Sequence, residues 1–390
     1  MRYAYTAEQE AWRNEVRRFV RKHVTPALRA EMRARGNEGD GPLARAFHQK
    51  LFDKGWWGVG WPKDFGGLGK SAVEQYIFID EMNGAGAPSM RLSITSVAPT
   101  ILRVGTEGQK QRWIPPILRG EMEFAIGYSE PDAGTDLAAL STRATLDGDE
   151  WVVSGQKIWN TGAHTATHNW LAVRTEPDVP KHKGISLLIL PMNLPGITVQ
   201  PIWTWPGIRT NAVFLDDVRV PRDHLIGERG HGFYYVMMAL DFERITLGSV
   251  GMLARLLDEL KAFVRRTRRN GEPLGRIPWV RRALADLEMR VEVGRQIGLL
   301  NAWLIDQGVV PTKEGSMSKV YVTELNAHVA SVGMEILGLA GQLDADDPAA
   351  PLHGRLQWLY TTAPMQRFGG GTNEIQRCII AQRGLGLPRK

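Results

Sequence analysis

Residues 240–244, Leu-Asp-Phe-Glu-Arg, place a carboxylate on a mostly apolar helical face. At helical spacing Glu243 shares its face with Val236, Ala239, Leu240, Thr246, Leu247 and Val250. Removal from water would raise the pKa of Glu243 toward neutrality, which suits a general base that takes a weakly acidic proton. A buried glutamate paired with an arginine of another helix explains the pattern equally well. Asp241 and Arg244 face a neighbouring side of this helix and could hold a polar ligand.

A polar turn follows the first strand-like segment. Residues 129–136, Ser-Glu-Pro-Asp-Ala-Gly-Thr-Asp, bring two hydroxyls and three acids together. Alone, such a segment is more typical of a capped turn than of a binding site.

Residues 155–161, Gly-Gln-Lys-Ile-Trp-Asn-Thr, predict a strand with Trp159 and Thr161 on one face. An aromatic plane beside a hydroxyl can flank and hydrogen-bond a flat heteroaromatic ring. Taken alone, Trp159 is more typical of core packing.

Three glycines, residues 369–371, precede Thr372, which is the predicted N-cap of a C-terminal helix. Main-chain amides without obstructing side chains favour a phosphate or a developing oxyanion. A flexible hinge between helices is the alternative interpretation.

The spacing of apolar residues predicts an order of helices, then strands, then helices. Capping signals and a 3.6-residue period indicate helices from Thr6 and over residues 44–54, 71–82 and 110–120. From about residue 124, short β-rich runs indicate a β-domain. After Gly232, helical patterns return over 233–268, 279–307, 313–337 and 372–383 and suggest an antiparallel bundle.

Composition excludes several classes of protein. The chain has 390 residues, 43% hydrophobic and 23% charged, so it can fold into two or three compact units. Its net charge of +6 suits an anionic small molecule as well as a nucleic acid. The basic run 265–269 ends a helical pattern and is more typical of a solvated helix end than of nucleic-acid binding. One cysteine, no zinc-ligand spacing and no membrane-spanning stretch indicate a cytoplasmic protein without a structural metal.

The ordered set of these motifs resembles the acyl-CoA dehydrogenase family of flavoproteins. The resemblance extends over nearly the whole chain, including Gly-Thr-Glu-Gly-Gln-Lys at 105–110 and Gly-Leu-Gly-Leu-Pro-Arg at 384–389. It implies an α+β multidomain fold, the acyl-CoA dehydrogenase fold. An N-terminal α-helical domain would span 1–122, a central β-domain 123–232 and a C-terminal four-helix bundle 233–390.

The resemblance also implies the site residues. Tyr128, Ser129, Trp159 and Thr161 match family contacts to the flavin ring, and Thr372 and Glu374 match contacts to FAD near its phosphates. Thr135, Asp241 and Arg244 match contacts to coenzyme A.

The chemistry implied is removal of the α-proton of an acyl-CoA by a glutamate, with hydride transfer from the β-carbon to flavin N5, giving a 2-enoyl-CoA. The commonest members carry the glutamate where this chain has Gly370, whereas branched-chain and long-chain types carry it at the position of Glu243. The Gly370 amide matches a backbone donor to the thioester oxygen. Its missing side chain predicts a branched, cyclic or bulky acyl group.

Two segments depart from the family pattern, at residues 267–271 and 335–339, and both concern the far end of FAD. We expect electron transfer to an electron-transferring flavoprotein and a homotetramer or homodimer. Arg266, Arg268 or Arg269 could replace a phosphate contact that these departures remove. Two alternatives remain for the function: an acyl-CoA oxidase-like flavoenzyme, and a non-catalytic or FAD-poor subunit of a heteromeric acyl-CoA dehydrogenase.

Overall fold

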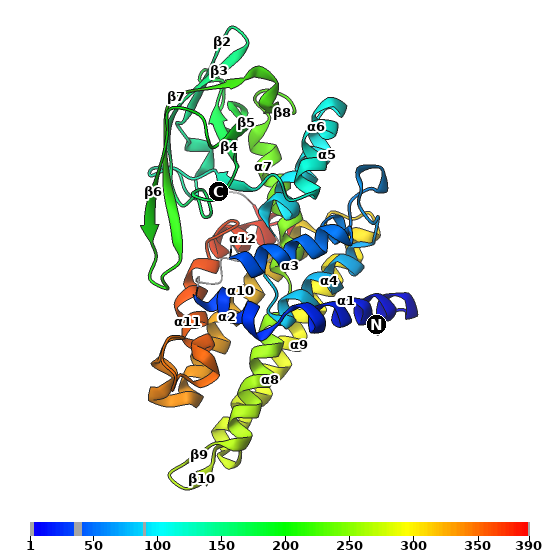
Figure 1. Cartoon of the computed structure of the whole chain (residues 1–390), viewed down its shortest axis with the longest axis vertical. Helices are drawn as coiled ribbons and strands as arrows, with labels where there is room; N and C mark the ends of the chain where they lie inside the picture. The colour runs from blue at the N-terminus through cyan, green and yellow to red at the C-terminus, as the bar shows by residue number, and fades with distance from the viewer. Residues whose placement is uncertain (1–3, 35–40, 89–90, 389–390) are drawn as a thin grey trace. The chain divides into compact units, whose positions relative to one another are not determined.

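The computed structural model describes residues 4–34, 41–88 and 91–388, without the side chains of residues 34 and 240–247 (Figure 1). The chain divides into two compact units. Unit 1 comprises residues 1–47, 70–89 and 244–390, and unit 2 comprises residues 48–69 and 90–243. Helices α3 (Pro42–Asp53) and α7 (Gly232–Leu247) contribute residues to both units.

The N-terminal helices of unit 1 begin with side-chain caps. They are α1 (Ala7–His23), α2 (Pro26–Ala34) and α4 (Ala72–Ala85). Thr6 and Gln9 form the predicted capping box of α1, and Ser71 and Glu74 form one for α4. At the start of α4, the carboxylate of Asp306 accepts bonds from the amides of Ala72 and Val73 at 2.6 and 3.1 Å. The start of α4 is thereby joined to Asp306, which lies more than 230 residues later in the sequence.

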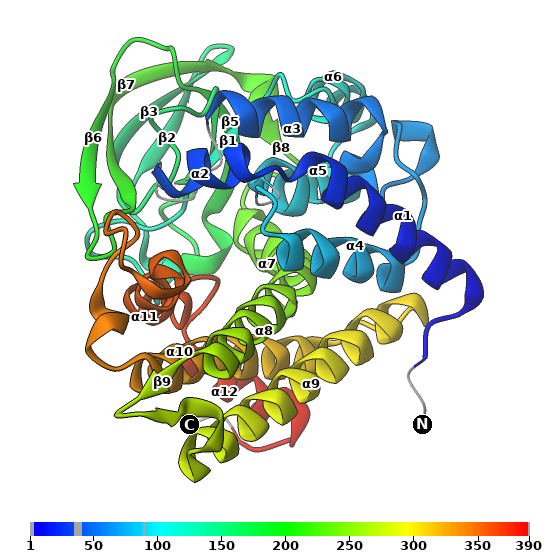
Figure 2. The ribbon, with the colours of Figure 1, turned by 60° about the horizontal axis from the view of Figure 1, so that its bottom comes forward.

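The C-terminal part of unit 1 is a helical bundle (Figure 2). Its helices are α8 (Gly251–Arg266), α9 (Pro278–Asp306), α10 (Thr312–Leu337), α11 (Arg355–Gln366) and α12 (Asn373–Ile379). Leucines and valines of α8, α9 and α10, such as Leu257, Leu287 and Val329, form a shared buried core with α11. The predicted helical bundle is confirmed.

The predicted single helix over 233–268 is wrong, because α7 and α8 are separate helices. The carboxylate of Asp80 accepts bonds from the hydroxyl of Ser249 at 2.9 Å and from the amide of Val250 at 3.0 Å. Gly251 packs directly on the carbonyl of Asp80, where a Cβ atom would clash at 2.0 Å. Asp80, which lies outside this segment, therefore determines where the helix is interrupted. The 3.6-residue period of apolar residues cannot reveal such a contact.

Unit 2 holds the β-domain and the helices α5 (Ala98–Val104) and α6 (Glu107–Leu118). The strands are β1 (Phe124–Gly127), β2 (Arg143–Asp147), β3 (Glu150–Lys157), β4 (His168–Arg174), β5 (Ile185–Pro191), β6 (Ile197–Trp203), β7 (Arg209–Pro221) and β8 (Leu225–Ile226). Their order in the sheet is β6-β7-β3-β2-β4-β5-β8, and β1 pairs parallel with β4.

The sheet positions the loop after β1 next to the end of β3. Antiparallel pairing of β3 with β7 continues to Lys157 and Val213, past a register shift between Val153 and Gly155. Central strands β4 and β5 are buried nearly throughout, which explains their continuous apolar runs. The predicted α-β-α order is confirmed. No helix in the part of the chain that the structure describes has the length and apolar character needed to cross a membrane.

Candidate functional site

The loop after β1 is tied to the end of β3 by main-chain and side-chain bonds. The amide of Ile158 donates to the carbonyl of Ser129 at 3.0 Å. The ammonium of Lys157 donates to the carbonyl of Tyr128 at 3.2 Å, and Trp170 Nε1 donates to the Tyr128 hydroxyl at 2.9 Å. Tyr128 and Ser129 are therefore held in fixed positions beside the residues that follow β3.

A buried ion pair lies beneath this loop. Lys157 Nζ lies 2.7 Å from Glu130 Oε1, and both side chains are buried. The same carboxylate accepts from the amide and hydroxyl of Ser141 and from the amide of Thr142, at 2.6 to 2.9 Å. Every oxygen of Glu130 thus has a donor, which is the condition for burying a carboxylate at moderate cost.

Burial and pairing shift the acid-base equilibria of this pair. Burial by itself would raise the pKa of Glu130, but the ammonium of Lys157 and the hydrogen bonds from Thr142 and Ser141 outweigh it and lower the pKa to about 2. Burial lowers the pKa of Lys157 to about 8, against the attraction of Glu130. Glu130 is thus anionic at neutral pH and is not a proton carrier.

Trp159 and Thr161 do not lie on one strand face, so that prediction is wrong. Strand β3 ends at Lys157, and Trp159 has a φ of 62°, which turns the chain out of the strand. Trp159 is 57% exposed and is not a core residue. Between them, buried Asn160 fixes the turn through its amide bond to the carbonyl of Asn211 and its side-chain bond from Asn169. An indole and a hydroxyl are still presented close together, by a turn.

The glycine-rich segment of unit 1 leads into α12. The Thr372 hydroxyl accepts from the amide of Ile375 at 3.2 Å, which confirms the predicted N-cap. Gly370 has a φ of 68°, which favours glycine, and its carbonyl accepts from the side chain of Gln376 at 3.3 Å. Exposed Glu374 has a pKa lowered by hydrogen bonds from its own amide and from the Thr372 hydroxyl.

A second buried lysine, which sequence reasoning missed, supports this segment. Lys319 on α10 donates to the carbonyl of Arg367 at 2.9 Å and to the side-chain oxygen of Asn373 at 2.7 Å. Thr323, one turn later, exchanges hydrogen bonds with Asn373 at 3.1 and 3.2 Å. Burial lowers the pKa of Lys319 to about 8, against the attraction of nearby carboxylates. The spacing of Lys319 and Thr323 by four residues is the one sequence signal that they share a face.

Three predicted residues have side chains outside the described residues. Asp241, Glu243 and Arg244 lie on the main chain of α7, but their side-chain positions are not described. Thr135 lies exposed in the turn after β1. The structure thus groups Tyr128, Ser129, Trp159 and Thr161 in unit 2, and groups Gly370, Thr372 and Glu374 in unit 1.

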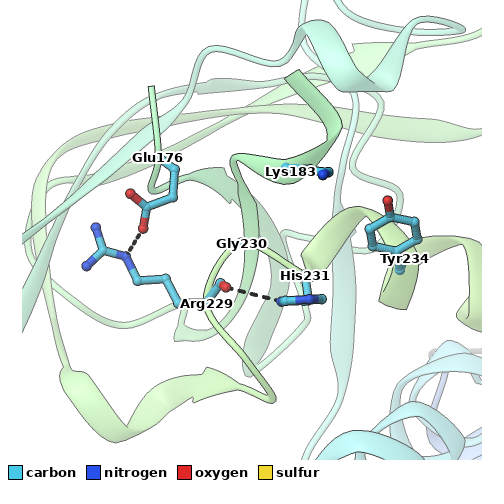
Figure 3. Close-up of a pocket in the computed structure, with 6 residues that line it drawn as sticks. All are labelled: Glu176, Lys183, Arg229, Gly230, His231 and Tyr234. Atoms are coloured by element: carbon cyan, nitrogen blue, oxygen red, sulfur yellow. Dashed lines mark hydrogen bonds and ion pairs between the residues drawn. The ribbon is translucent and has the colours of Figure 1, made fainter. Parts of the chain in front are cut away.

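Unit 2 also contains a pocket of about 570 Å³ (Figure 3). Arg229 forms an ion pair with Glu176 at one side, and Nδ1 of His231 lies 3.3 Å from the carbonyl oxygen of Arg229. Lys183 and Tyr234 line the opposite side. Cations and an aromatic ring suit an anionic ligand with a planar part. None of these residues was predicted.

The two segments that depart from the family pattern lie against each other. Residues 268–273 form a hairpin, β9 (Arg268–Arg269) and β10 (Glu272–Pro273), with Asn270 and Gly271 at positive φ. The Asn-Gly pair is a hairpin signal that could have predicted it. Arg269 Nη2 donates to the carbonyl of Ile336 at 2.7 Å, so this guanidinium is used within its own unit. No group of three or more histidine, cysteine or acidic side chains among the described residues is placed to hold a metal ion.

Similarity to known protein families identifies the class of protein to which this chain belongs. Models of the acyl-CoA dehydrogenase N-terminal, middle and C-terminal domains match residues 6–121, 125–218 and 230–385. Acyl-CoA dehydrogenase FadE26 of Mycobacterium tuberculosis is 40% identical over the whole chain and 99% of its own length, and FadE29 is 38% identical over 98% of both chains.

Solved structures of similar proteins support the same class. The Tcur3481-Tcur3483 steroid ACAD superposes with a TM-score of 0.93 at 38% identity, and the ChsE4-ChsE5 complex from Mycobacterium tuberculosis with 0.92 at 40%; each comparison covers both chains completely. The chain belongs to the acyl-CoA dehydrogenase family, whose members are flavoprotein oxidoreductases.

Proposed function

We propose that this chain is an FAD-dependent dehydrogenase that converts an acyl-CoA thioester to a 2-enoyl-CoA, with Glu243 as the base. The observation that carries the proposal is the bond between the Ile158 amide and the Ser129 carbonyl, which sets Ser129 beside the turn of Trp159 and Thr161. Family membership supports the same reaction class.

The residues present suit an isoalloxazine ring. Trp159 offers an exposed indole, and Ser129 and Thr161 offer hydroxyls on a framework fixed by Glu130 and Lys157. Thr372 and Glu374 would hold FAD near its phosphates. When bound, FAD supplies the acceptor for the hydride that leaves the β-carbon of the substrate.

Proton removal falls to Glu243 because Gly370 has no side chain to accept a proton. The main chain of α7 carries Glu243 one turn before the C-terminal end of the helix. The amide of Gly370, which donates to no acceptor among the described atoms, would stabilise the charge that develops on the thioester oxygen. The base would then come from α7, and the oxyanion donor from the glycine-rich segment that precedes α12.

Coenzyme A would contact Thr135, Asp241 and Arg244, and Lys183 and Arg229 of the pocket offer cationic groups to its phosphates. For the acyl group we propose a polycyclic or otherwise bulky chain. Two features support this: Gly370 has no side chain, which would leave room near the reacting carbons, and one similar structure is described as a steroid ACAD. The electrons would pass to an electron-transferring flavoprotein.

A second candidate is the FAD-poor subunit of a heteromeric dehydrogenase. Both of the similar structures named above, Tcur3481-Tcur3483 and the ChsE4-ChsE5 complex, are named for two different polypeptides. Arg269 Nη2 already donates to the carbonyl of Ile336, which leaves fewer of its donors for the phosphate contact that the family pattern would provide. A homotetramer or homodimer is the arrangement proposed for the first candidate.

The visible spectrum of the purified protein, alone and after anaerobic addition of acyl-CoA thioesters, separates these candidates. We expect a bound-flavin spectrum that bleaches with ring-bearing thioesters more readily than with short straight-chain ones. Equal or faster bleaching by a short straight chain would refute the bulky substrate. A colourless protein that takes up no added FAD would support the partner-subunit candidate instead.

A further inference from the structure

Four arginines from three helices lie close together in unit 1, and two of them share one carboxylate. Arg29 and Arg33 lie one turn apart on α2, Arg255 lies on α8, and Arg355 begins α11. Arg255 Nε donates to Glu259 at 3.1 Å, and Arg355 forms an ion pair with the other oxygen of the same carboxylate. We call these four arginines and Glu259 the arginine cluster.

Part of the positive charge is directed at the C-terminal end of α4. Arg29 Nη2 donates to the carbonyl of Ala85 at 3.2 Å. Arg255 Nη1 lies so close to Gly86 that a Cβ atom there would be 1.8 Å away. Cations at this end of a helix are favourable, but a helix end carries only about half an elementary charge.

The charges of the arginine cluster do not balance. Among the described residues, Glu259 is the one carboxylate that pairs with the cluster, through Arg255 and Arg355, while Arg29 and Arg33 lie close enough to repel these guanidinium groups. Arginine stays protonated in proteins, so four positive charges are set against one negative charge. Burial and the neighbouring guanidinium groups lower the pKa of Arg29 and Arg355, despite Glu259. Arg33 has no carboxylate partner among the described residues.

Two donors of the cluster are also unused. The Nε atoms of Arg29 and Arg355 are buried and have no acceptor among the described atoms. An N–H that is buried without an acceptor is costly, and such a group calls for an explanation. The side chains of Arg255 and Arg355 are about one quarter exposed, so a small molecule can reach them.

We propose that the arginine cluster is a binding site for a small oxyanion, a phosphate or carboxylate group. Planar guanidinium forks match the oxygens of both groups, and Glu259 orients two of the forks. The anion would offset the excess charge that the cluster's own carboxylate leaves uncompensated. This site is independent of the proposed dehydrogenase reaction.

Thermal unfolding of the full chain in sodium phosphate, sodium succinate and sodium chloride at equal ionic strength tests the proposal. Binding to the folded state predicts a Tm that rises with the logarithm of phosphate or succinate concentration beyond any rise in chloride. A response to phosphate alone identifies a phosphate site, and a response to succinate identifies a carboxylate site. A Tm that is the same in all three salts overturns the proposal.

Arg33→Gln is the informative variant because Arg33 makes no ion pair with any of the described residues. It should weaken the anion response by about tenfold in apparent affinity, since one charge-assisted bond is removed. Without anion its Tm should be equal to or above that of the parent, because repulsion is relieved. The matched control is Arg21→Gln on an exposed face of α1, which should keep the full response.

Equal anion responses in Arg33→Gln and Arg21→Gln would overturn the proposal. If Arg33→Gln does not fold, Arg33→Lys keeps the charge but not the planar fork, and it must show a weaker response. Neither measurement involves FAD or acyl-CoA, so the result does not depend on whether the proposed function is correct.

Discussion

The ammonium of Lys157 lies 2.7 Å from the carboxylate of Glu130, and both groups are buried beneath the loop that presents Ser129. Removal of one partner leaves the other charge buried and unpaired, which typically costs about 3–5 kcal/mol. We therefore expect Lys157→Met to lower the free energy of unfolding by this amount, measured by urea denaturation.

The double variant Glu130→Gln/Lys157→Met should recover part of that loss, because no lone charge remains. Arg219→Gln, which breaks an exposed pair with Asp147, is the control and should have almost no effect. A double variant no more stable than Lys157→Met alone would contradict this account of the pair. If the pair also positions the flavin contacts, Lys157→Met should bind FAD more weakly in a spectral titration.

Lys319→Met should loosen the glycine-rich segment. It removes donors from the carbonyl of Arg367 and from Asn373, and an unsatisfied buried acceptor costs about 1–3 kcal/mol. The expected loss of stability is measured as a lower midpoint of urea denaturation. Lys50→Met, at an exposed position on α3, should leave the midpoint unchanged. A Lys319→Met protein as stable as the parent would show that the segment is held by other contacts.

Asp80→Ala tests the cause of the break between α7 and α8. Loss of a carboxylate that accepts from Ser249 and Val250 should cost about 1–2 kcal/mol of stability, as for other capping residues. Urea denaturation measures the change, with Asp258→Ala on the exposed side of α8 as the control. Equal urea midpoints for Asp80→Ala and Asp258→Ala would show that Asp80 does not stabilise the break between α7 and α8.

Acid should destabilise unit 2 through His168. Burial, with a smaller contribution from His224, lowers the pKa of His168 from 6.5 to about 4. Between these values the unfolded chain binds the proton more readily than the folded chain, so stability is complete above about pH 6.5 and falls as the pH decreases. We expect a loss of about 2 kcal/mol by pH 4, after allowance for partial exposure.

The pH dependence should be shallower in His168→Gln and unchanged in His353→Gln, where the imidazole is exposed. The measurement is urea denaturation at a series of pH values. Parallel curves for His168→Gln and the parent protein would assign the acid sensitivity to other groups.

Local sequence patterns correctly predicted the features that depend on residues close together in the chain. The capping box at Thr6, the N-cap at Thr372 and the α-β-α order follow from contacts between residues close in the chain. The pairs Glu130–Lys157 and Lys319–Asn373 depend on how separate elements pack, so no periodicity reveals them. The turn at Trp159 was missed because its positive φ breaks the alternation assumed for a strand. Glu243 was proposed from its apolar helical face together with the family resemblance, and it stays a prediction.

The most direct test of the proposed function is exchange of the substrate α-proton with solvent deuterium, followed in parent protein and in Glu243→Gln. The account predicts exchange in the parent and a loss of at least about a hundredfold in Glu243→Gln, the usual contribution of a general base. Glu288→Gln, on an exposed part of α9, should exchange normally, and all three proteins should keep the same flavin spectrum. Exchange at the parental rate in a flavin-loaded Glu243→Gln protein would contradict the central claim.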